Sequence, residues 1–318
     1  MDQILEQVYD RLADGRAHSG QELARELGIS RSAVWKHVET LRSLALNVPA
    51  RSAGGYQLAS PIQRPSLDEI RRRLNPPPID LEHRFLVDST NACLRRERRD
   101  HPPPRALIAE AQSLGRGRRD RAWLSPPGAG VYLSLSWCFE SGLTGLSALS
   151  LVTGVAIAEV LQSLGVAEVG LKWPNDLWVS GQKLGGCLIE ISGSAEGPCE
   201  AVCGLGLNLN HGRAPAIDQA WTDLARQGIE PDRNALYADL INALVRAYGA
   251  LDQSGFSSFQ ARWSSLDALR NHRIQLTGPL AGPSEGIARG VDAQGRLLFE
   301  GPTGMQAMSS GEVSVRRC

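Results

Sequence analysis

The chain has 318 residues, of which 42% are hydrophobic and 21% are charged, and its formal net charge is +0. This length and composition are typical of a globular protein with two or three domains, and they exclude a disordered chain. A molecule without net charge has no long-range field that draws it to nucleic acid, so any DNA contact must depend on a local patch.

The chain shows no sign of export or of a membrane span. Its N-terminus is acidic and is followed by no apolar signal segment, which predicts a cytoplasmic protein. The most apolar helical run, residues 146–164, contains Ser147, Ser150, Thr153 and Glu159, so we expect a buried core helix. The six cysteines form neither a Cys-x-x-Cys pair nor a zinc pattern, so we expect them to be reduced and structural.

Three short helices are expected at the start of the chain. Apolar residues at helical spacing predict the first helix over residues 4–12. Ser19 is a suitable N-cap for a second helix that ends at Gly28, and Ser30 is a suitable N-cap for a third over residues 31–44. Two helices joined by so short a turn form a helix-turn-helix.

The third helix has the pattern of a DNA-recognition helix. Its buried stripe is Val34, Val38 and Leu41, which leaves polar and basic residues on the opposite side. The residues expected to reach DNA are Ser30, Arg31, Ser32, Trp35, Lys36 and His37. Residues 48–50 and 55–58 alternate like two strands of a basic wing, so we predict a winged helix-turn-helix. A protein-interaction or purely structural module is the alternative.

A proline-rich junction and a mixed α/β segment follow. The junction is Ser60 to Pro65, and we place the domain boundary after residue 62. Strand-like and helical runs then alternate, which predicts an α/β or α+β sheet domain over residues 63–270 within a multidomain α+β protein. The strand-like runs are residues 106–109, 131–136, 169–173, 187–191 and 201–207, and the helical runs are 91–99, 147–164 and 234–252.

The last segment, residues 271–318, is predicted to form a small β domain. Short alternating segments separated by Gly, Pro and Asp turns predict an SH3-like β-barrel over residues 271–318. With these boundaries, the N-terminal module comprises residues 1–62. The expected strands are residues 274–276, 286–290, 297–299 and 313–315.

The central segment contains a cluster of cations and glycines. Residues 115–121, Gly-Arg-Gly-Arg-Arg-Asp-Arg, combine arginines that can hold phosphate oxygens with glycines that let backbone approach a ligand. Residues 172–176 and 183–186 add two lysines and an aspartate. Neither the phosphate loop nor the dinucleotide turn is present, so we expect another fold to bind an ATP-like anion.

These motifs resemble those of a known family. Residues 88–91 with Gln112, then 115–119, 172–176, 183–186 and 206–208 follow the order found in biotin–protein ligases. With the N-terminal module, the whole chain resembles the bifunctional biotin ligases and biotin-operon repressors.

The resemblance implies a central class II synthetase-like catalytic domain that forms biotinyl-5'-adenylate from biotin, ATP and Mg²⁺. It further implies transfer of biotin to a lysine of the biotin carboxyl carrier protein of acetyl-CoA carboxylase. The adenylate would also act as corepressor and favour a homodimer that binds operator DNA.

The resemblance also assigns roles to residues. Two anions must meet in the adenylation step, so cations are needed there. The catalytic residues would be Arg116, Arg118, Lys183 and Asp176, with Asp176 acting on the carrier lysine or helping to hold Mg²⁺, and no fixed metal site is expected. The biotin-binding residues would be Ser89, Thr90, Asn91, Gln112, Gly115, Arg116, Lys183, Gly185 and Gly186. ATP or adenylate would contact Arg118, Arg121, Trp123, Lys172, Asn175 and Asn208.

Other interpretations remain open at this point. The chain could be a ligand-sensing transcription factor without efficient transfer, a ligase whose winged module binds no operator, or a lipoate or octanoate ligase. Asp120 stands where the family commonly has glycine and places an acid among the arginines. The arginine-rich loop is expected to fold only when a ligand compensates its charge. Taken singly, 115–121 could be a solvated basic loop and Trp123 a core residue.

Overall fold

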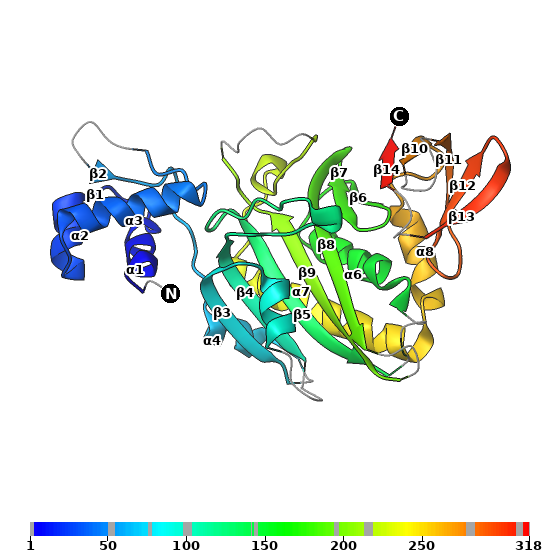
Figure 1. Cartoon of the computed structure of the whole chain (residues 1–318), viewed down its shortest axis with the longest axis horizontal. Coiled ribbons are helices and arrows are strands. Elements are labelled where there is room, and N and C mark those ends of the chain that lie inside the picture. The colour runs from blue at the N-terminus through cyan, green and yellow to red at the C-terminus, as the bar shows by residue number, and fades with distance from the viewer. Residues whose placement is uncertain are drawn as a thin grey trace.

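The structure is a computed structural model that describes most of the chain. The described residues are 3–49, 55–75, 78–97, 104–140, 142, 146–193, 197–212, 219–277, 284–309 and 314–317, without the side chains of Asp120, Ser314 and Arg317. A helical N-terminal module, a central sheet with helices and a small C-terminal sheet follow one another across the molecule (Figure 1).

The N-terminal helices agree with the sequence prediction. They are α1 (Gln3–Leu12), α2 (Gly20–Leu27) and α3 (Arg31–Ser43). The Ser19 hydroxyl accepts from the Glu22 N–H at 3.0 Å, and α2 ends at Gly28 with φ of 65°. A helix that stops in the left-handed region favours glycine because a Cβ there is strained.

The wing differs from the prediction. β2 (Gly55–Tyr56) pairs antiparallel with β1 (His18–Ser19), a segment for which no strand was expected. Residues 48–49 form no strand, and Pro49 has no N–H to donate to a ladder. The predicted strand is therefore wrong for these two residues, and residues 50–54 lie outside the described part of the chain.

The central domain is built on a mixed sheet of seven strands, in the order β3-β4-β5-β9-β8-β7-β6. β3 and β4 pair in parallel, and the other neighbouring strands among the described residues pair antiparallel. The strands are β3 (Asp80–Val87), β4 (Arg105–Gln112), β5 (Gly130–Phe139), β6 (Val169–Lys172), β7 (Asp176–Val179), β8 (Gln182–Gly193) and β9 (Cys199–Asn208).

Helices cover both faces of this sheet. α6 (Leu149–Ser163) and α7 (Arg233–Ser254) pack on one face with Leu133 of β5, and α5 (Thr90–Arg96) packs on the other with Tyr132. Neighbouring residues of a strand point to opposite faces of the sheet, which explains why Tyr132 and Leu133 belong to different apolar clusters. Two further helices, α4 (Leu67–Arg73) and α8 (Ser257–Leu266), contact α7, and α8 also contacts α6.

The C-terminal domain is a five-stranded antiparallel sheet in the order β13-β12-β11-β10-β14. Its strands are β10 (Arg273–Thr277), β11 (Ser284–Val291), β12 (Leu297–Gly301), β13 (Gly304–Met308) and β14 (Ser314–Arg317). Ile274 and Phe299 join the same apolar cluster as α6, so this sheet is docked on the central domain. The indole N–H of Trp173 reinforces the contact by donating to the Gly295 carbonyl at 3.0 Å.

A buried ion pair within the central domain is also contacted by the N-terminal module. Glu110 of β4 has no exposed side-chain surface and accepts from both terminal nitrogens of Arg233, at 2.9 and 2.8 Å. The Tyr9 hydroxyl of α1 lies 3.3 Å from the same carboxylate. Arg64 lies over the Tyr9 ring and pairs with Glu6 of α1.

Two expectations about the class of protein can be checked. None of the described helices is long and apolar enough to cross a membrane. The apolar α6 is instead buried in the central core, as predicted. The described cysteines are free, namely Cys93, Cys138, Cys187, Cys199 and Cys203, and Cys318 lies outside the described residues. A cytoplasmic location stays a prediction.

Candidate active site

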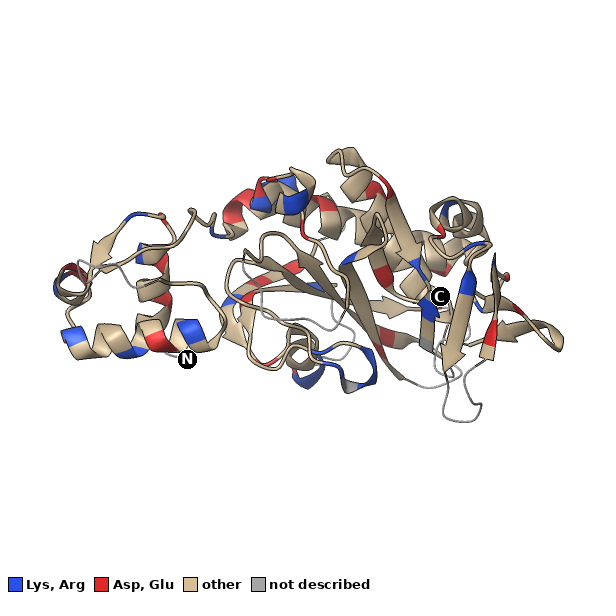
Figure 2. Ribbon diagram, turned by 90° about the horizontal axis from the view of Figure 1, so that it is seen from above, with Lys and Arg blue, Asp and Glu red and all other residues tan. Residues whose placement is uncertain are grey.

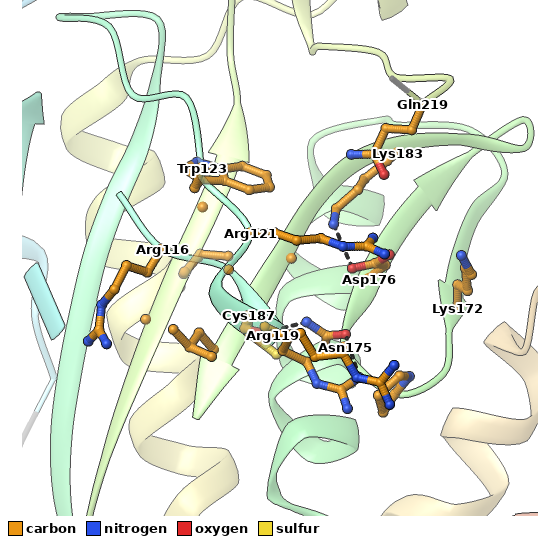
Figure 3. A pocket seen from close by; sticks show the side chains of 18 of the residues that line it. Arg116, Arg119, Arg121, Trp123, Lys172, Asn175, Asp176, Lys183, Cys187 and Gln219 are labelled. Carbon is orange, nitrogen blue, oxygen red and sulfur yellow. Dashed lines mark hydrogen bonds and ion pairs between the residues drawn. The ribbon is translucent and has the colours of Figure 1, made fainter. Parts of the chain in front are cut away.

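A cleft of about 480 Å³ lies on the α5 face of the central sheet. The start of α5, the arginine-rich loop, the β6–β7 turn and strands β8 and β9 all contribute to it (Figure 3). The predicted residues that line it are Ser89, Thr90, Asn91, Gln112, Arg116, Arg118, Arg121, Trp123, Lys172, Asn175, Asp176, Lys183 and Gly186. Segments far apart in the sequence are thus brought to one place.

Three predicted residues lie outside this lining: Gly115, Gly185 and Asn208. A Cβ on Gly115 would lie 2.4 Å from the Trp123 carbonyl oxygen, so glycine is needed for the loop to close there. Gly185 lies next to Gly186 in β8, and the Asn208 amide donates to the Thr222 carbonyl at 2.9 Å. Gly115 therefore acts on the shape of the loop, whereas Gly185 and Asn208 do not line the cleft.

The arginine-rich loop, residues 115–123, is a closed hairpin. The Trp123 N–H donates to the Gly115 carbonyl at 2.8 Å, and the Gly117 N–H donates to the Arg121 carbonyl at 2.7 Å. The loop thus has a defined backbone conformation, and its dependence on a bound ligand stays a prediction. Basic residues gather on this hairpin (Figure 2), and Glu190 supplies part of the compensating charge through Arg116. The side chain of Asp120 lies outside the described atoms.

An ion pair stands on one side of the cleft. The Lys183 Nζ lies 2.8 Å from Asp176 Oδ1 and 5.4 Å from the centre of the Trp123 ring. Arg116 points away from this pair (Figure 3). The Trp123 ring itself fits because Gly206 has no side chain, since a Cβ there would lie 2.4 Å from the ring.

Two further cations are partly removed from water. Burial, and the neighbouring Arg119, lower the pKa of Arg118, whose guanidinium lies 3.5 Å from the Asn175 amide oxygen. Burial also lowers the pKa of Lys172, although Asp176 opposes the shift. A bound anion would offset the cost of burying these charges, so the cleft favours phosphate or carboxylate ligands.

The other end of the cleft is a network of uncharged hydrogen bonds. The Thr90 N–H donates to Gln112 Oε1 at 2.9 Å, and the Thr90 hydroxyl lies 3.2 Å from the same oxygen. Ser134 of β5 lies 2.7 Å from the Thr90 hydroxyl and 2.6 Å from Asn91 Oδ1. This end suits a small polar ring that both donates and accepts.

Sequence reasoning missed several residues at this cleft. Trp178, Gly204 and Arg316 line it, and Ser134 and Glu190 contact residues that do. Alternation along β9 could have placed Gly204 on the same face as Gly206. No sequence signal marks Glu190, because it is a single carboxylate within an apolar strand.

The predicted DNA-reading side of α3 is open to solvent. Trp35 is 54% exposed, and Val34, Val38 and Leu41 are buried, as predicted. The helix carries Arg31, Lys36 and Arg42 against one acidic residue, Glu39 (Figure 2). A local basic surface therefore exists on a molecule without net charge.

Three protein-family models match the chain in the order of its segments. The HTH domain matches residues 3–57, the Biotin/lipoate A/B protein ligase family matches residues 84–208, and the Biotin protein ligase C terminal domain matches residues 271–316. Fold and site thus define a ligase of the biotin/lipoate class that carries a helix-turn-helix module.

Curated relatives narrow this class. The Bifunctional ligase/repressor BirA of Salmonella typhimurium is 40% identical over 309 residues, which are 96% of this chain and 95% of the relative. The protein of the same name from Escherichia coli is 39% identical over the same shares. The chain belongs to this family of bifunctional ligase/repressors, which confirms the resemblance drawn from the motifs.

A solved structure agrees with this assignment. The biotin protein ligase from Aquifex aeolicus in complex with biotin and ATP has a TM-score of 0.64 and 27% sequence identity to this chain. The matched region covers 75% of this chain and 99% of the Aquifex aeolicus chain.

Proposed function

We propose that the chain joins biotin to ATP as biotinyl-5'-adenylate and then transfers biotin to a lysine of the biotin carboxyl carrier protein of acetyl-CoA carboxylase. The observation that carries the proposal is one cleft with a cationic side, at Lys183, Arg118 and Lys172, and an uncharged hydrogen-bonding end at Thr90 and Gln112. The family and a structural neighbour with bound biotin and ATP support it.

The first step needs the biotin carboxylate to approach the α-phosphorus of ATP. A carboxylate oxygen attacks phosphorus, the bond from phosphorus to the bridging oxygen breaks, and pyrophosphate leaves with that electron pair. We assign Lys183 to the carboxylate, and Arg118 and Arg121 to the phosphates, because like charges must be neutralised for the attack. The Arg116 guanidinium is instead held by Glu190. The ureido ring would lie at the hydrogen-bonded end, against residues 89–91 and the backbone of the hairpin.

The second step transfers the acyl group. The carrier lysine attacks the acyl carbon as a free amine, AMP leaves, and the amine proton must be removed. We assign Asp176 to holding Lys183 in place, because the two side chains lie 2.8 Å apart. Asp176 becomes available to take the proton once the biotin carboxylate replaces it as the partner of Lys183.

Mg²⁺ is proposed to enter with ATP as part of the substrate. Within the described residues, no group of three or more His, Cys, Asp and Glu side chains could hold a metal ion. Mg²⁺ commonly keeps several waters and binds substrate phosphates with one or two carboxylates. Among the described residues that line the cleft, Asp176 is the carboxylate that fits that role.

The N-terminal module is proposed to bind operator DNA through α3. The exposed side of α3 offers Arg31, Ser32, Trp35 and Lys36. One such helix reads a short half-site, so sequence-specific repression requires a dimer on a palindromic operator. We propose that bound adenylate favours this homodimer and so acts as corepressor, with residues 1–62, 63–270 and 271–318 as the three functional segments.

The test is to incubate the purified chain with biotin, MgATP and a carrier domain, and to follow pyrophosphate release and covalent biotin on the carrier. Loss of both products in Lys183→Ala and in Arg118→Ala supports the ligase. Pyrophosphate release without transfer identifies a sensor that makes its own corepressor, and neither product in the wild-type chain overturns the enzymatic proposal. Operator binding is measured separately, with and without adenylate.

A further inference from the structure

Glu190 of β8 lies outside the sequence motifs, yet it receives hydrogen bonds from three side chains. Arg116 Nη2 lies 3.0 and 3.1 Å from its two oxygens, Arg95 Nη1 lies at 2.6 Å, and Asn91 Nδ2 lies at 2.9 Å. Its side chain is 17% exposed. One carboxylate therefore connects the arginine hairpin, α5 and the sheet.

The contact with Asn91 fixes the direction of hydrogen bonds in the cleft. The Asn91 amide nitrogen donates to Glu190 and also to the Leu188 carbonyl at 3.1 Å. Both are acceptors, so the amide oxygen must face the other way, where the Ser134 hydroxyl lies at 2.6 Å. A carboxylate that accepts hydrogen bonds thus makes Asn91 present an acceptor toward Ser134.

The hydroxyls beyond Asn91 have too few hydrogens for their contacts. Ser134 and Thr90 carry one hydroxyl hydrogen each. Three short oxygen–oxygen contacts compete for these two hydrogens: Ser134 with Asn91, Ser134 with Thr90, and Thr90 with Gln112. One contact therefore lacks a hydrogen, and this end of the cleft offers spare acceptors to a ligand that donates N–H groups, as a ureido ring does.

The same network reaches the far arm of the hairpin. The Gln112 amide nitrogen donates to the Ser125 hydroxyl at 2.9 Å, and that hydroxyl donates to the Trp123 carbonyl at 3.1 Å. Arg116 on the near arm is held by Glu190. Both arms of the hairpin are thus fastened to one hydrogen-bonded system, which passes through the end of the cleft.

Packing leaves Asn91 little freedom. A Cβ on Gly204 would lie 2.4 Å from the Asn91 amide oxygen, so glycine at this position admits the amide. Gly204 pairs with Ser134 on one side and with Leu188 on the other, which brings the partners of Asn91 to one face. The arrangement depends on strand register as well as on the side chains.

We propose that Glu190 is a positioning residue for the ring end of the cleft. It sets the orientation of Asn91, and through Asn91 the acceptor character of the network, while its pair with Arg116 holds the hairpin over the same end. The identity of the ring as the ureido ring of biotin rests on the proposed function, whereas the link between Glu190 and the hairpin does not.

The first test uses Glu190→Gln, which keeps the size of the side chain and removes its charge. Losing a charged hydrogen-bond partner should raise the KM for biotin about tenfold and change the KM for ATP by less than about twofold. Arg95→Ala is the matched control, because Arg95 also pairs with Glu190 but does not line the cleft. Both KM values should stay unchanged in this control.

The second test needs no substrate. The hairpin contains four arginines, so trypsin cleavage within residues 115–121, located by mass spectrometry, reports how firmly it is held. Cleavage should be faster in Glu190→Gln than in the wild type and unchanged in Arg95→Ala. Gly204→Ala disturbs Asn91 without removing the Glu190–Arg116 pair, so it should raise the KM for biotin and leave the cleavage rate unchanged.

These outcomes separate the inference from the proposed function. Unchanged biotin KM and unchanged cleavage in folded Glu190→Gln, or the same changes in Arg95→Ala, would overturn the positioning role. Faster cleavage in Glu190→Gln, in a chain whose wild type releases no pyrophosphate with biotin and MgATP, would support the link to the hairpin and reject the proposed ligase activity. Thermal unfolding of each variant verifies that it is folded.

Discussion

Lys183 Nζ and Asp176 Oδ1 lie 2.8 Å apart within the cleft, and a substitution in this pair tests the roles proposed for both residues. If Asp176 positions Lys183 for the biotin carboxylate, Asp176→Asn should slow pyrophosphate release in the absence of carrier protein by about tenfold. Asp239→Asn, on the exposed side of α7, is the control and should behave like the wild type. Normal pyrophosphate release combined with lost transfer would instead make Asp176 a base for the carrier lysine alone.

The buried imidazole of His211 leads to a prediction of how the free energy of unfolding depends on pH. Burial lowers its pKa from the usual 6.5 to about 4, and neither ring nitrogen has a hydrogen-bond partner among the described atoms. The unfolded chain therefore binds more protons than the folded chain between pH 6.5 and 4, so stability falls as the pH is lowered through this window.

His211→Gln should remove this component, which is at most about 3 kcal/mol. The measurement is urea unfolding of both proteins at several pH values between 7 and 4. Parallel pH profiles for wild type and variant would contradict the assignment.

Much of the lining of the cleft could be predicted, because arginine, lysine and glycine in close spacing mark anion binding. Ser134 and Glu190 could not, since neither belongs to a motif and each lies in a mainly apolar part of its strand. Their importance comes from register: Gly204 stands opposite both Ser134 and Leu188, and only the folded sheet reveals this. Which of the lining residues bind biotin or ATP stays a prediction.

At the scale of elements, local signals explain which predictions succeeded. α2 and α3 begin directly after capping serines, and α2 ends at a glycine, so their bounds could be read from the sequence. β3 was missed because His83 interrupts the side formed by Leu81, Phe85 and Val87, and Leu86 interrupts the charged side. Its charges are matched by neighbours, as when Glu82 pairs with Arg105 at 2.7 Å. β13 was missed because most of it is exposed.

The capping box of α2 leads to a prediction for the winged module. Ser19 and Glu22 satisfy each other's backbone N–H groups, so Ser19→Ala should reduce the free energy of unfolding of the module by about 1 kcal/mol. Ser43→Ala, at the exposed end of α3, is the control and should cost less. Urea unfolding followed by circular dichroism measures both. An equal loss in the two variants would show that the cap is not the cause.

At the scale of the whole molecule, Glu110 is one of the residues through which the DNA-reading module contacts the central sheet. It lies on β4, which also carries Gln112 of the cleft. Burial raises the pKa of Glu110, but Arg233 and Arg64 outweigh burial, so the pKa lies below its usual value. The charged carboxylate therefore stabilises the folded chain at pH values above the pKa that Glu110 has in the unfolded chain. This stabilisation is lost as the pH falls through the lower pKa of the folded chain.

Glu110→Gln should leave the guanidinium of Arg233 buried without its carboxylate. Removing one partner of a buried pair costs about 3–5 kcal/mol, whereas replacing both by apolar groups is often neutral. We therefore expect Glu110→Gln to lower the free energy of unfolding strongly, and Glu110→Gln with Arg233→Met to recover most of the loss. Calorimetry and urea unfolding of the full chain measure this. If the second substitution adds to the loss, the two residues do not act as a pair.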